Sequence, residues 1–220
     1  MPRESKVARR RRAERIGEKL EASHPDARCE LDFASPFQLL VATILSAQNT
    51  DRNVNSVTPA LFDRYPDARG LSRASPEALE RLVHSCGFFR QKTRTLLGMA
   101  RRLVEQHGGE VPGELADLVA LPGVGRKTAN LVLGNCFNVP GIVVDTHVTR
   151  LAQRWKLTAE AKPEKIERDL MELIPEPKWT RFSHAAIFHG RLVCDARRPR
   201  CEVCALPPDC PYPERKESER

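Results

Sequence analysis

The segment LPGVGRKTAN, residues 121–130, decides both the fold and the function that this sequence predicts. Gly123 and Gly125 lack a Cβ, so the backbone there can adopt positive φ and approach a ligand closely. A helix that begins near Arg126 would point free N–H groups and the positive end of its dipole at an anion. Lys127 supplies a point charge or, once its amine has lost a proton, a nucleophile. The segment therefore predicts a helical hairpin that binds a phosphate.

A carboxylate follows this segment at Asp145, in the sequence VDTH of residues 144–147. An amine and a carboxylate that face one site can divide nucleophilic attack and proton transfer between them. Two plainer interpretations stay open. Lys127 binds phosphate without chemistry, as in hairpins that only bind DNA, and Asp145 is an ordinary helix N-cap.

Four of the seven cysteines crowd into the pattern Cys194-x6-Cys201-x2-Cys204-x5-Cys210. Four thiolates on one short loop can converge on a metal centre. Zinc sites with four cysteines usually consist of two C-x2-C pairs, whereas only Cys201 and Cys204 form such a pair here. The uneven spacing favours an iron–sulfur cluster, with zinc as the alternative.

The hairpin, the VDTH sequence and the cysteine spacing together resemble the endonuclease III family of DNA glycosylases over nearly the whole chain. The resemblance implies that the turn of Gly123, Val124 and Gly125 grips a DNA phosphate. It also implies that Lys127 is the catalytic nucleophile and that Asp145 assists it. The four clustered cysteines would hold a [4Fe-4S] cluster.

Two loops are predicted to enter the DNA, because an enzyme that extrudes a base must fill the space that the base leaves. Gln48 lies in the loop SAQNTD of residues 46–51, and Phe88 follows Gly87 directly. In the family that the chain resembles, the corresponding glutamine and an apolar residue are inserted into DNA. The family residue at the second position is usually leucine, so Phe88 is a departure. Without the resemblance, Gln48 would be an exposed loop amide and Phe88 a core contact.

Basic side chains provide further candidate contacts to DNA. The chain has 36 lysines and arginines against 29 acidic residues, a net charge of +7, which favours a polyanionic partner. Arg197, Arg198 and Arg200 lie in the first loop of the cysteine cluster, and in the family this loop contacts DNA. His147 and Arg150 follow Asp145 on the first turns of a helix, where we expect them to contact phosphate.

The resemblance implies a base excision repair enzyme. The expected reaction removes oxidised or damaged pyrimidines from double-stranded DNA through attack of Lys127 on C1′, and cleaves the abasic site by β-elimination. The expected partner is double-stranded DNA that contains damaged pyrimidines or abasic sites. The alternatives are a mismatch-specific adenine glycosylase, whose members usually lack a lysine at this position, and a non-catalytic iron–sulfur protein that binds DNA.

The predicted fold is all-α, with two helical domains and a DNA-binding cleft between them. Residues 30–139 would form a barrel-like helical domain that contains the helix-hairpin-helix at about residues 114–134. Residues 1–29 together with 140–220 would form an iron–sulfur domain whose cluster loop spans residues 194–210.

Local signals predict where several helices begin and end. Residues 36–45 are almost uniformly apolar, which predicts a central buried helix. Asp51 is expected to cap the next helix, and Ser75 precedes a proline at the start of another. A further helix is expected from about Gln91 to the glycine pair that begins at Gly108.

The sequence contains no run of eighteen apolar residues and no hydrophobic signal core near its beginning. We therefore expect a monomeric, cytoplasmic protein without a membrane segment, associated with the nucleoid if it is bacterial.

Overall fold

The computed structural model describes residues 4–212, which form helices and loops without a β-strand. This confirms the all-α prediction. Residues 1–3 and 213–220 of the predicted iron–sulfur domain lie outside the described residues. No helix in the described part of the chain has the length and apolar character needed to cross a membrane.

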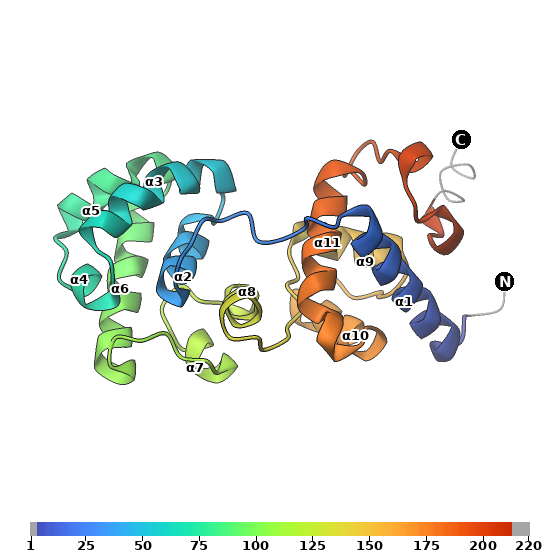
Figure 1. Ribbon diagram of the computed structural model, residues 1–220, viewed down its shortest axis with the longest axis horizontal. Helices are drawn as coiled ribbons and strands as arrows, with labels where there is room; N and C mark the ends of the chain where they lie inside the picture. Colours follow the sequence, from blue (N-terminus) through green and yellow to red (C-terminus); the bar gives the residue numbers. More distant parts are fainter. Residues whose placement is uncertain (1–3, 213–220) are drawn as a thin grey trace. The chain divides into compact units, whose positions relative to one another are not determined.

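The chain divides into two compact units, one of which is Cys29–Val139 and the other the described residues on either side of it. Figure 1 labels the longer helices of both units. The Cys29–Val139 unit contains α2 (Pro36–Leu45), α3 (Asp51–Arg64), α4 (Ala68–Ser72), α5 (Pro76–Val83), η1 (His84–Cys86), α6 (Phe89–His107), α7 (Leu115–Val119) and α8 (Arg126–Cys136). The other unit contains α1 (Lys6–Ser23), α9 (Thr146–Arg154), α10 (Pro163–Leu173), η2 (Glu176–Lys178), α11 (Trp179–Leu192), η3 (Cys201–Val203) and η4 (Pro207–Asp209).

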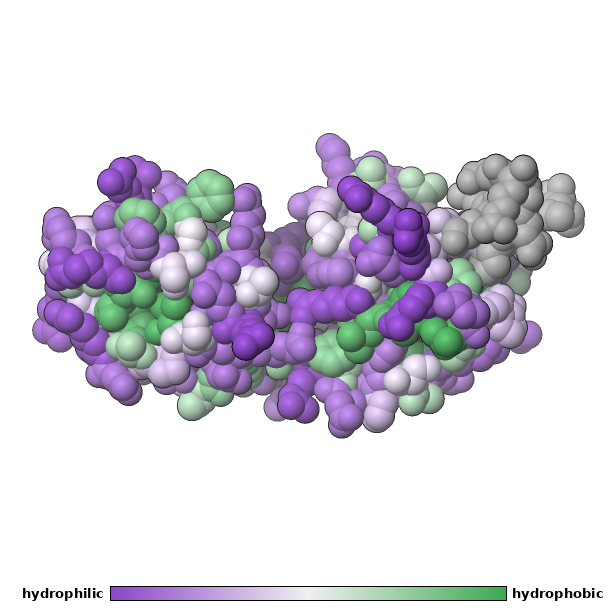
Figure 2. Space-filling model, turned by 90° about the horizontal axis from the view of Figure 1, so that it is seen from above, coloured by the Kyte–Doolittle hydropathy of each residue, from purple (hydrophilic) through white to green (hydrophobic). Residues whose placement is uncertain are grey.

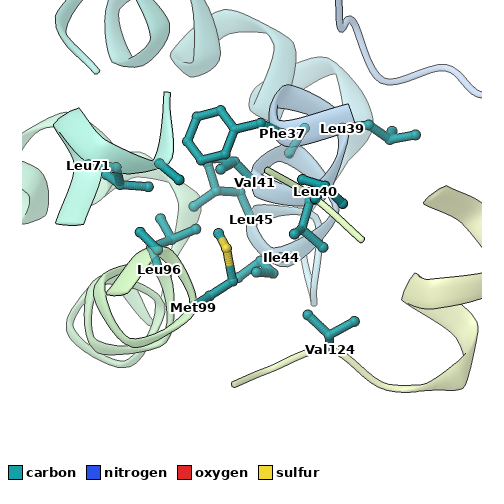
Figure 3. Packing of buried hydrophobic residues seen from close by; sticks show 14 of the residues in the cluster. Phe37, Leu39, Leu40, Val41, Ile44, Leu45, Leu71, Leu96, Met99 and Val124 are labelled. Carbon is teal, nitrogen blue, oxygen red and sulfur yellow. The ribbon is translucent and has the colours of Figure 1, made fainter. Parts of the chain in front are cut away.

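Helix α2 is the centre of the Cys29–Val139 unit, as its apolar sequence predicted. The Ser35 hydroxyl accepts a hydrogen bond from the backbone N–H of Gln38, and Pro36 occupies the first turn. Figure 3 shows the side chains of α2 gathered against those of α4 and α6, and Val124 from the hairpin turn belongs to the same hydrophobic cluster. The turn that bears the candidate phosphate site is therefore anchored in the core.

Other helix boundaries differ from the sequence expectation in detail. Thr50, not Asp51, caps α3, because the Thr50 hydroxyl accepts from the N–H of Asn53 while Asp51 is already the first helical residue. Ser75 caps α5 as predicted. Helix α6 begins at Phe89, two residues before Gln91, and ends where Gly108 takes a left-handed conformation (φ 63°).

The second unit packs α1 against α10 and α11, so segments from before and after the Cys29–Val139 unit share one hydrophobic core. Asp209 is buried just before the last cysteine of the loop, and its carboxylate accepts hydrogen bonds from Lys19 and Arg15 of α1. Burial alone would raise the pKa of Asp209, but the hydrogen bonds from Lys19 and Arg15 lower it. Helix α1 therefore holds the end of the cysteine loop.

Figure 2 shows hydrophilic residues over much of the visible face of each unit, with hydrophobic residues in smaller groups. Phe88 is an exception to the general burial of aromatic residues, because 67% of it is exposed. The ring of Phe88 is therefore accessible to another molecule.

Candidate nucleic-acid interface and active site

The turn between α7 and α8 requires glycine at position 123. Gly123 has φ 75°, a left-handed conformation that side chains other than glycine rarely adopt. A Cβ at this position would lie 2.1 Å from Cγ2 of Thr95 on α6. Both the backbone conformation and the packing of α6 against the turn therefore demand a residue without a side chain.

Gly125, unlike Gly123, does not use the positive φ that a glycine can adopt. It is the N-cap of α8 with φ −90° and ψ 173°, an extended conformation open to any residue. A Cβ built on Gly125 would meet nothing within 4 Å. The fold itself does not require this glycine, and the space before α8 remains open to a close approach of another molecule.

The N-terminus of α8 also lacks a side-chain cap. In contrast, α2, α3 and α5 each begin at a hydroxyl that accepts from an N–H of the first turn. The first N–H groups of a helix have no partner within the helix, so an uncapped start can bind an anion. The structure thus has the geometry that a phosphate site needs at the hairpin.

Val124 anchors the hairpin turn from inside. Its side chain is 5% exposed, and its backbone N–H donates to the carbonyl of Leu121 at 3.1 Å. The Val124 amide, one of the groups predicted to contact DNA, is therefore already engaged within the turn.

Lys127 is exposed on the first turn of α8, whereas Ala129 and Val132 of the same helix are buried. No ion pair among residues 4–212 involves Lys127. Its amine is thus neither buried nor neutralised by a carboxylate within the described chain. A nucleophile must be able to reach its substrate, and this side chain can.

Asp145 is the N-cap of α9, and its Oδ1 accepts from the N–H of Val148 at 2.8 Å. The N-cap interpretation of this residue is therefore correct as far as it goes. A carboxylate has a second oxygen, so Asp145 can cap α9 through Oδ1 and still act on another group through Oδ2. Lys127 belongs to the Cys29–Val139 unit and Asp145 to the other unit.

Arg150 and His147 both lie against the end of α11. Arg150 donates through Nη2 to the carbonyls of Gly190 (2.9 Å) and Cys194 (3.1 Å), and the same nitrogen lies 3.2 Å from Nδ1 of His147. A Cβ on Gly190 would come within 2.8 Å of the His147 side chain. Burial lowers the pKa of His147. In the structure these two predicted phosphate contacts help to hold the start of the cysteine loop.

The four cysteines of the loop are free and half-buried. Burial raises the pKa of Cys210 to about 11, and the neighbouring thiols of Cys194, Cys204 and Cys201 act in the same direction. Burial likewise raises the pKa of Cys204. Four thiols on one loop have the ligand chemistry of an iron–sulfur site. Among residues 4–212, no three His, Cys, Asp or Glu side chains are already arranged as ligands around one metal position.

Arg154 clamps the start of the cysteine loop, a role that the sequence analysis missed. Its Nη1 lies 3.1 Å from the sulfur of Cys194 and donates to the carbonyl of Asp195 at 2.7 Å, while its Nη2 donates to the carbonyl of Ala196 at 2.6 Å. Its guanidinium also stacks on the Tyr212 ring, 4.5 Å from the centroid. The available signal was its spacing of four residues from Arg150, which places both on one face of α9.

His189 is a second residue near the cysteines. It is 2% exposed, and burial lowers its pKa to about 4. One ring nitrogen lies 3.6 Å from the sulfur of Cys204 and the other 3.1 Å from Nε2 of His24. Its role in the structure is to tie α11 to both α1 and the loop.

The arginines of the cysteine loop are exposed, as a phosphate clamp requires. The backbone N–H groups of Arg197 and Arg198 donate to Oδ1 of Asp195, and these bonds lower the pKa of the Asp195 carboxyl. The side chain of Arg200 donates to the carbonyl of Leu192. The guanidinium groups of Arg197 and Arg198 extend from a loop whose backbone is fixed by its own carboxylate.

Gln48 and Phe88, the two residues predicted to enter DNA, share an unusual backbone conformation. Both have positive φ, 54° and 47°, which is uncommon outside glycine and occurs preferentially at functional sites. Both are exposed. The exposure of Phe88 excludes the interpretation of this residue as a core contact.

Comparison with known proteins places this architecture in a family. Residues 41–176 match the pattern of the HhH-GPD superfamily of base excision DNA repair proteins. Endonuclease III from Synechocystis sp. is 52% identical over 206 residues, which cover 93% of this chain and 94% of that protein.

Two solved structures are also closely similar in fold. One is a non-covalent endonuclease III–DNA complex, with a TM-score of 0.90, 37% identity and coverage of 95% of this chain and 98% of that one. The other is a trapped covalent intermediate of endonuclease III with DNA, with the same TM-score and identity and coverage of 94% and 98%. The chain therefore belongs to the endonuclease III family, within the HhH-GPD superfamily of base excision DNA repair proteins.

Proposed function

We propose that this protein removes oxidised or otherwise damaged pyrimidines from duplex DNA, with Lys127 as the nucleophile and Asp145 as its acidic partner. As a member of the endonuclease III family, it is a base excision repair DNA glycosylase that also acts as an abasic-site lyase. The family match favours this function over a mismatch-specific adenine glycosylase and over a non-catalytic DNA-binding protein.

The observation that carries the assignment is the position of Lys127. Its side chain is exposed and free of ion pairs among the described residues, one residue past the uncapped start of α8. The trapped covalent complex of a related endonuclease III with DNA supports a protein nucleophile of this kind.

The proposed reaction has two stages, excision of the base and cleavage of the strand. The uncharged amine of Lys127 attacks C1′ of the damaged nucleotide, and the glycosidic bond breaks as the base leaves with its electron pair and a proton. Asp145 stabilises the positive charge that develops on the sugar and takes part in proton transfer. The C1′–O4′ bond of the sugar ring then breaks as the amine loses a proton and O4′ takes one up, which gives a Schiff base. The Schiff base makes the neighbouring C2′ proton acidic, and loss of this proton breaks the C3′–O bond, expels the 3′ phosphate and cuts the strand.

Binding of DNA would use the hairpin and the two exposed loops. The open space at Gly125 admits a phosphate to the uncapped amides of α8. Gln48 and Phe88 would fill the space left by the extruded base, the amide by hydrogen bonding and the ring by stacking. Arg197 and Arg198 would add contacts to the DNA backbone.

We also propose that Cys194, Cys201, Cys204 and Cys210 hold a [4Fe-4S] cluster. When bound, the cluster would cross-link the loop that presents Arg197 and Arg198, and no step of the reaction is assigned to it. The proposed domains follow the predicted boundaries, with residues 30–139 as the helical domain and the cysteine loop in the other. We propose that the protein acts as a monomer.

Strand cleavage and borohydride trapping test this proposal. A duplex with one thymine glycol should be cleaved by the wild-type protein, and borohydride should yield a covalent protein–DNA adduct that is absent with Lys127→Ala. Removal of adenine from a mismatch without strand cleavage would indicate the adenine glycosylase instead. Binding without any cleavage would leave only a DNA-binding protein.

A further inference from the structure

The loops that carry Gln48 and Phe88 are far apart in the sequence but are joined by a polar network inside the Cys29–Val139 unit. The first loop follows α2, and the second lies between η1 and α6. Lys92 bonds to the residues directly before both loops, and Asn53 bonds to the first loop and to η1, which precedes the second. Neither side chain has a role in the proposed chemistry.

Lys92 lies on the first turn of α6 and is 5% exposed. Its ammonium donates to the carbonyl of Leu45, the last residue of α2, at 2.8 Å. It also donates to the carbonyl of Cys86, the last residue of η1, at 2.8 Å. One buried cation thus fixes the points from which both loops begin.

Burial of an ammonium group costs free energy, because the charge loses its contact with water. For the same reason, burial lowers the pKa of Lys92. An apolar side chain of similar length would fill the same volume without this cost. What the ammonium adds is direction, since it requires two carbonyls at hydrogen-bond distance.

Asn53 repeats this connection from α3. Its Nδ2 donates to Oδ1 of Asn49 at 3.1 Å and to the carbonyl of Ser85 at 3.0 Å. The same oxygen of Asn49 accepts from the N–H of Thr50. Asn53 therefore joins the far end of the first loop to the segment that leads into the second.

The two connections enclose both exposed residues. Gln48 lies between the anchor points at Leu45 and Asn49, and Phe88 follows the anchor at Cys86 by two residues. Both residues have left-handed backbone conformations, which persist only where the surrounding structure enforces them. The network supplies that enforcement.

We propose that Lys92 and Asn53 are positioning residues that hold the Gln48 and Phe88 loops in one fixed relation, so that both enter the DNA together. This inference rests on the proposed function, because it concerns the loops that fill the space of the extruded base. Loss of the network would impair the opening of a duplex but not the chemistry on DNA that is already single-stranded.

The test compares Asn53→Ala and Lys92→Met with a matched control, Asn55→Ala, in the full-length protein. Asn55 is also on α3 and also makes two hydrogen bonds, to the carbonyl of Glu30 and from the N–H of Asp32, but it touches neither loop. Single-turnover rates are measured on a thymine glycol in duplex DNA and on an abasic site in single-stranded DNA. A 2-aminopurine beside the lesion reports base unstacking in the duplex.

We expect Asn53→Ala and Lys92→Met to slow excision from the duplex by about tenfold or more and to reduce unstacking, because misplaced groups lose effective concentration. Their rates on the single-stranded abasic site, and both rates of Asn55→Ala, should stay within about twofold of wild type. If Lys92→Met does not fold, the Asn53 and Asn55 pair decides.

Two results would overturn the inference while the proposed function stands. One is a wild-type enzyme that is active, with Asn53→Ala no slower on the duplex than Asn55→Ala. The other is an equal loss by Asn53→Ala on both DNAs, which would indicate general destabilisation. A wild-type protein inactive on both DNAs would contradict the proposed function itself and the inference with it.

Discussion

The starts of α8 and α9 each carry one of the two proposed catalytic residues, yet they are built in opposite ways. At α9, Asp145 caps its own helix, and a negative charge at a helix N-terminus is favourable. At α8, the cap is Gly125, which has no side chain, and Lys127 places a positive charge where the helix dipole disfavours it.

This difference separates residues that the fold needs from residues that it does not. Asp145 stabilises its helix whatever else it does, so its presence alone says little about catalysis. The start of α8 forgoes both a side-chain cap and a favourable charge. A local cost of this kind without a structural benefit is typical of a functional site.

The largest expected effect is at Lys127. Lys127→Gln should reduce strand cleavage at a damaged pyrimidine by about 10⁴-fold or more, because the nucleophile is lost. The free energy of unfolding should not fall, since the side chain is exposed and unpaired among the described residues. Single-turnover cleavage and urea unfolding measure the two quantities. A variant that loses stability and activity together would place Lys127 among the structural residues.

Two substitutions should distinguish the capping role of Asp145 from its catalytic role. Asparagine caps helices as well as aspartate, so Asp145→Asn should keep the unfolding free energy within about 0.5 kcal/mol while base excision falls about 10²-fold to 10³-fold. Asp145→Ala should lose the same activity and, in addition, about 1 kcal/mol of stability. Full activity in the asparagine variant would leave Asp145 with the cap alone.

The two glycines of the hairpin turn should respond in opposite ways. Gly123→Ala should cost about 2 kcal/mol or more of unfolding free energy, because its φ is positive and a Cβ would collide with Thr95. Gly125→Asp should raise stability by up to about 1 kcal/mol by making the start of α8 resemble that of α9.

The same Gly125→Asp variant should bind duplex DNA about tenfold more weakly, since its carboxylate would occupy and repel the phosphate position. Fluorescence anisotropy with a labelled duplex measures this affinity. Unchanged binding would mean that the start of α8 is not the phosphate site.

The smallest expected effect is on acid stability in the unit that contains α9. Burial lowers the pKa of His184 to about 4, so the folded state stays neutral while the unfolded state takes up a proton below about pH 6.5. His184 therefore leaves the free energy of unfolding unchanged above this pH. Below it, the free energy of unfolding falls as the pH falls towards 4, by about 1 kcal/mol at pH 5.5.

Tryptophan fluorescence can follow this loss, because both tryptophans, Trp155 and Trp179, belong to the same unit as His184. His184→Gln should remove this part of the pH dependence. An unchanged slope in that variant would assign the acid sensitivity to other groups.

Much of the fold could be predicted from local sequence signals. The apolar run of α2 and the Ser-Pro start of α5 are confirmed, because burial and capping are decided within a few residues. The cap at Asp51 was wrong, since two adjacent residues could both cap α3 and only their backbone conformations decide between them.

The candidate site was predictable where it rests on single residues in a motif, and not where it rests on contacts. Lys127 and Asp145 were found from the hairpin and VDTH sequences. The clamp of Arg154 on the cysteine loop and the bonds of Lys92 at the start of two loops join segments that are distant in the sequence. The spacing of residues in the sequence does not predict such contacts, because they form only when the helices pack.

The most direct test of the central claim is to locate the covalent bond. The adduct formed with abasic DNA and borohydride is digested with protease and nuclease, and the modified peptide is sequenced by mass spectrometry. The account predicts that the sugar remnant lies on Nζ of Lys127, at the start of α8. A remnant on another lysine or on the N-terminal amine would contradict it.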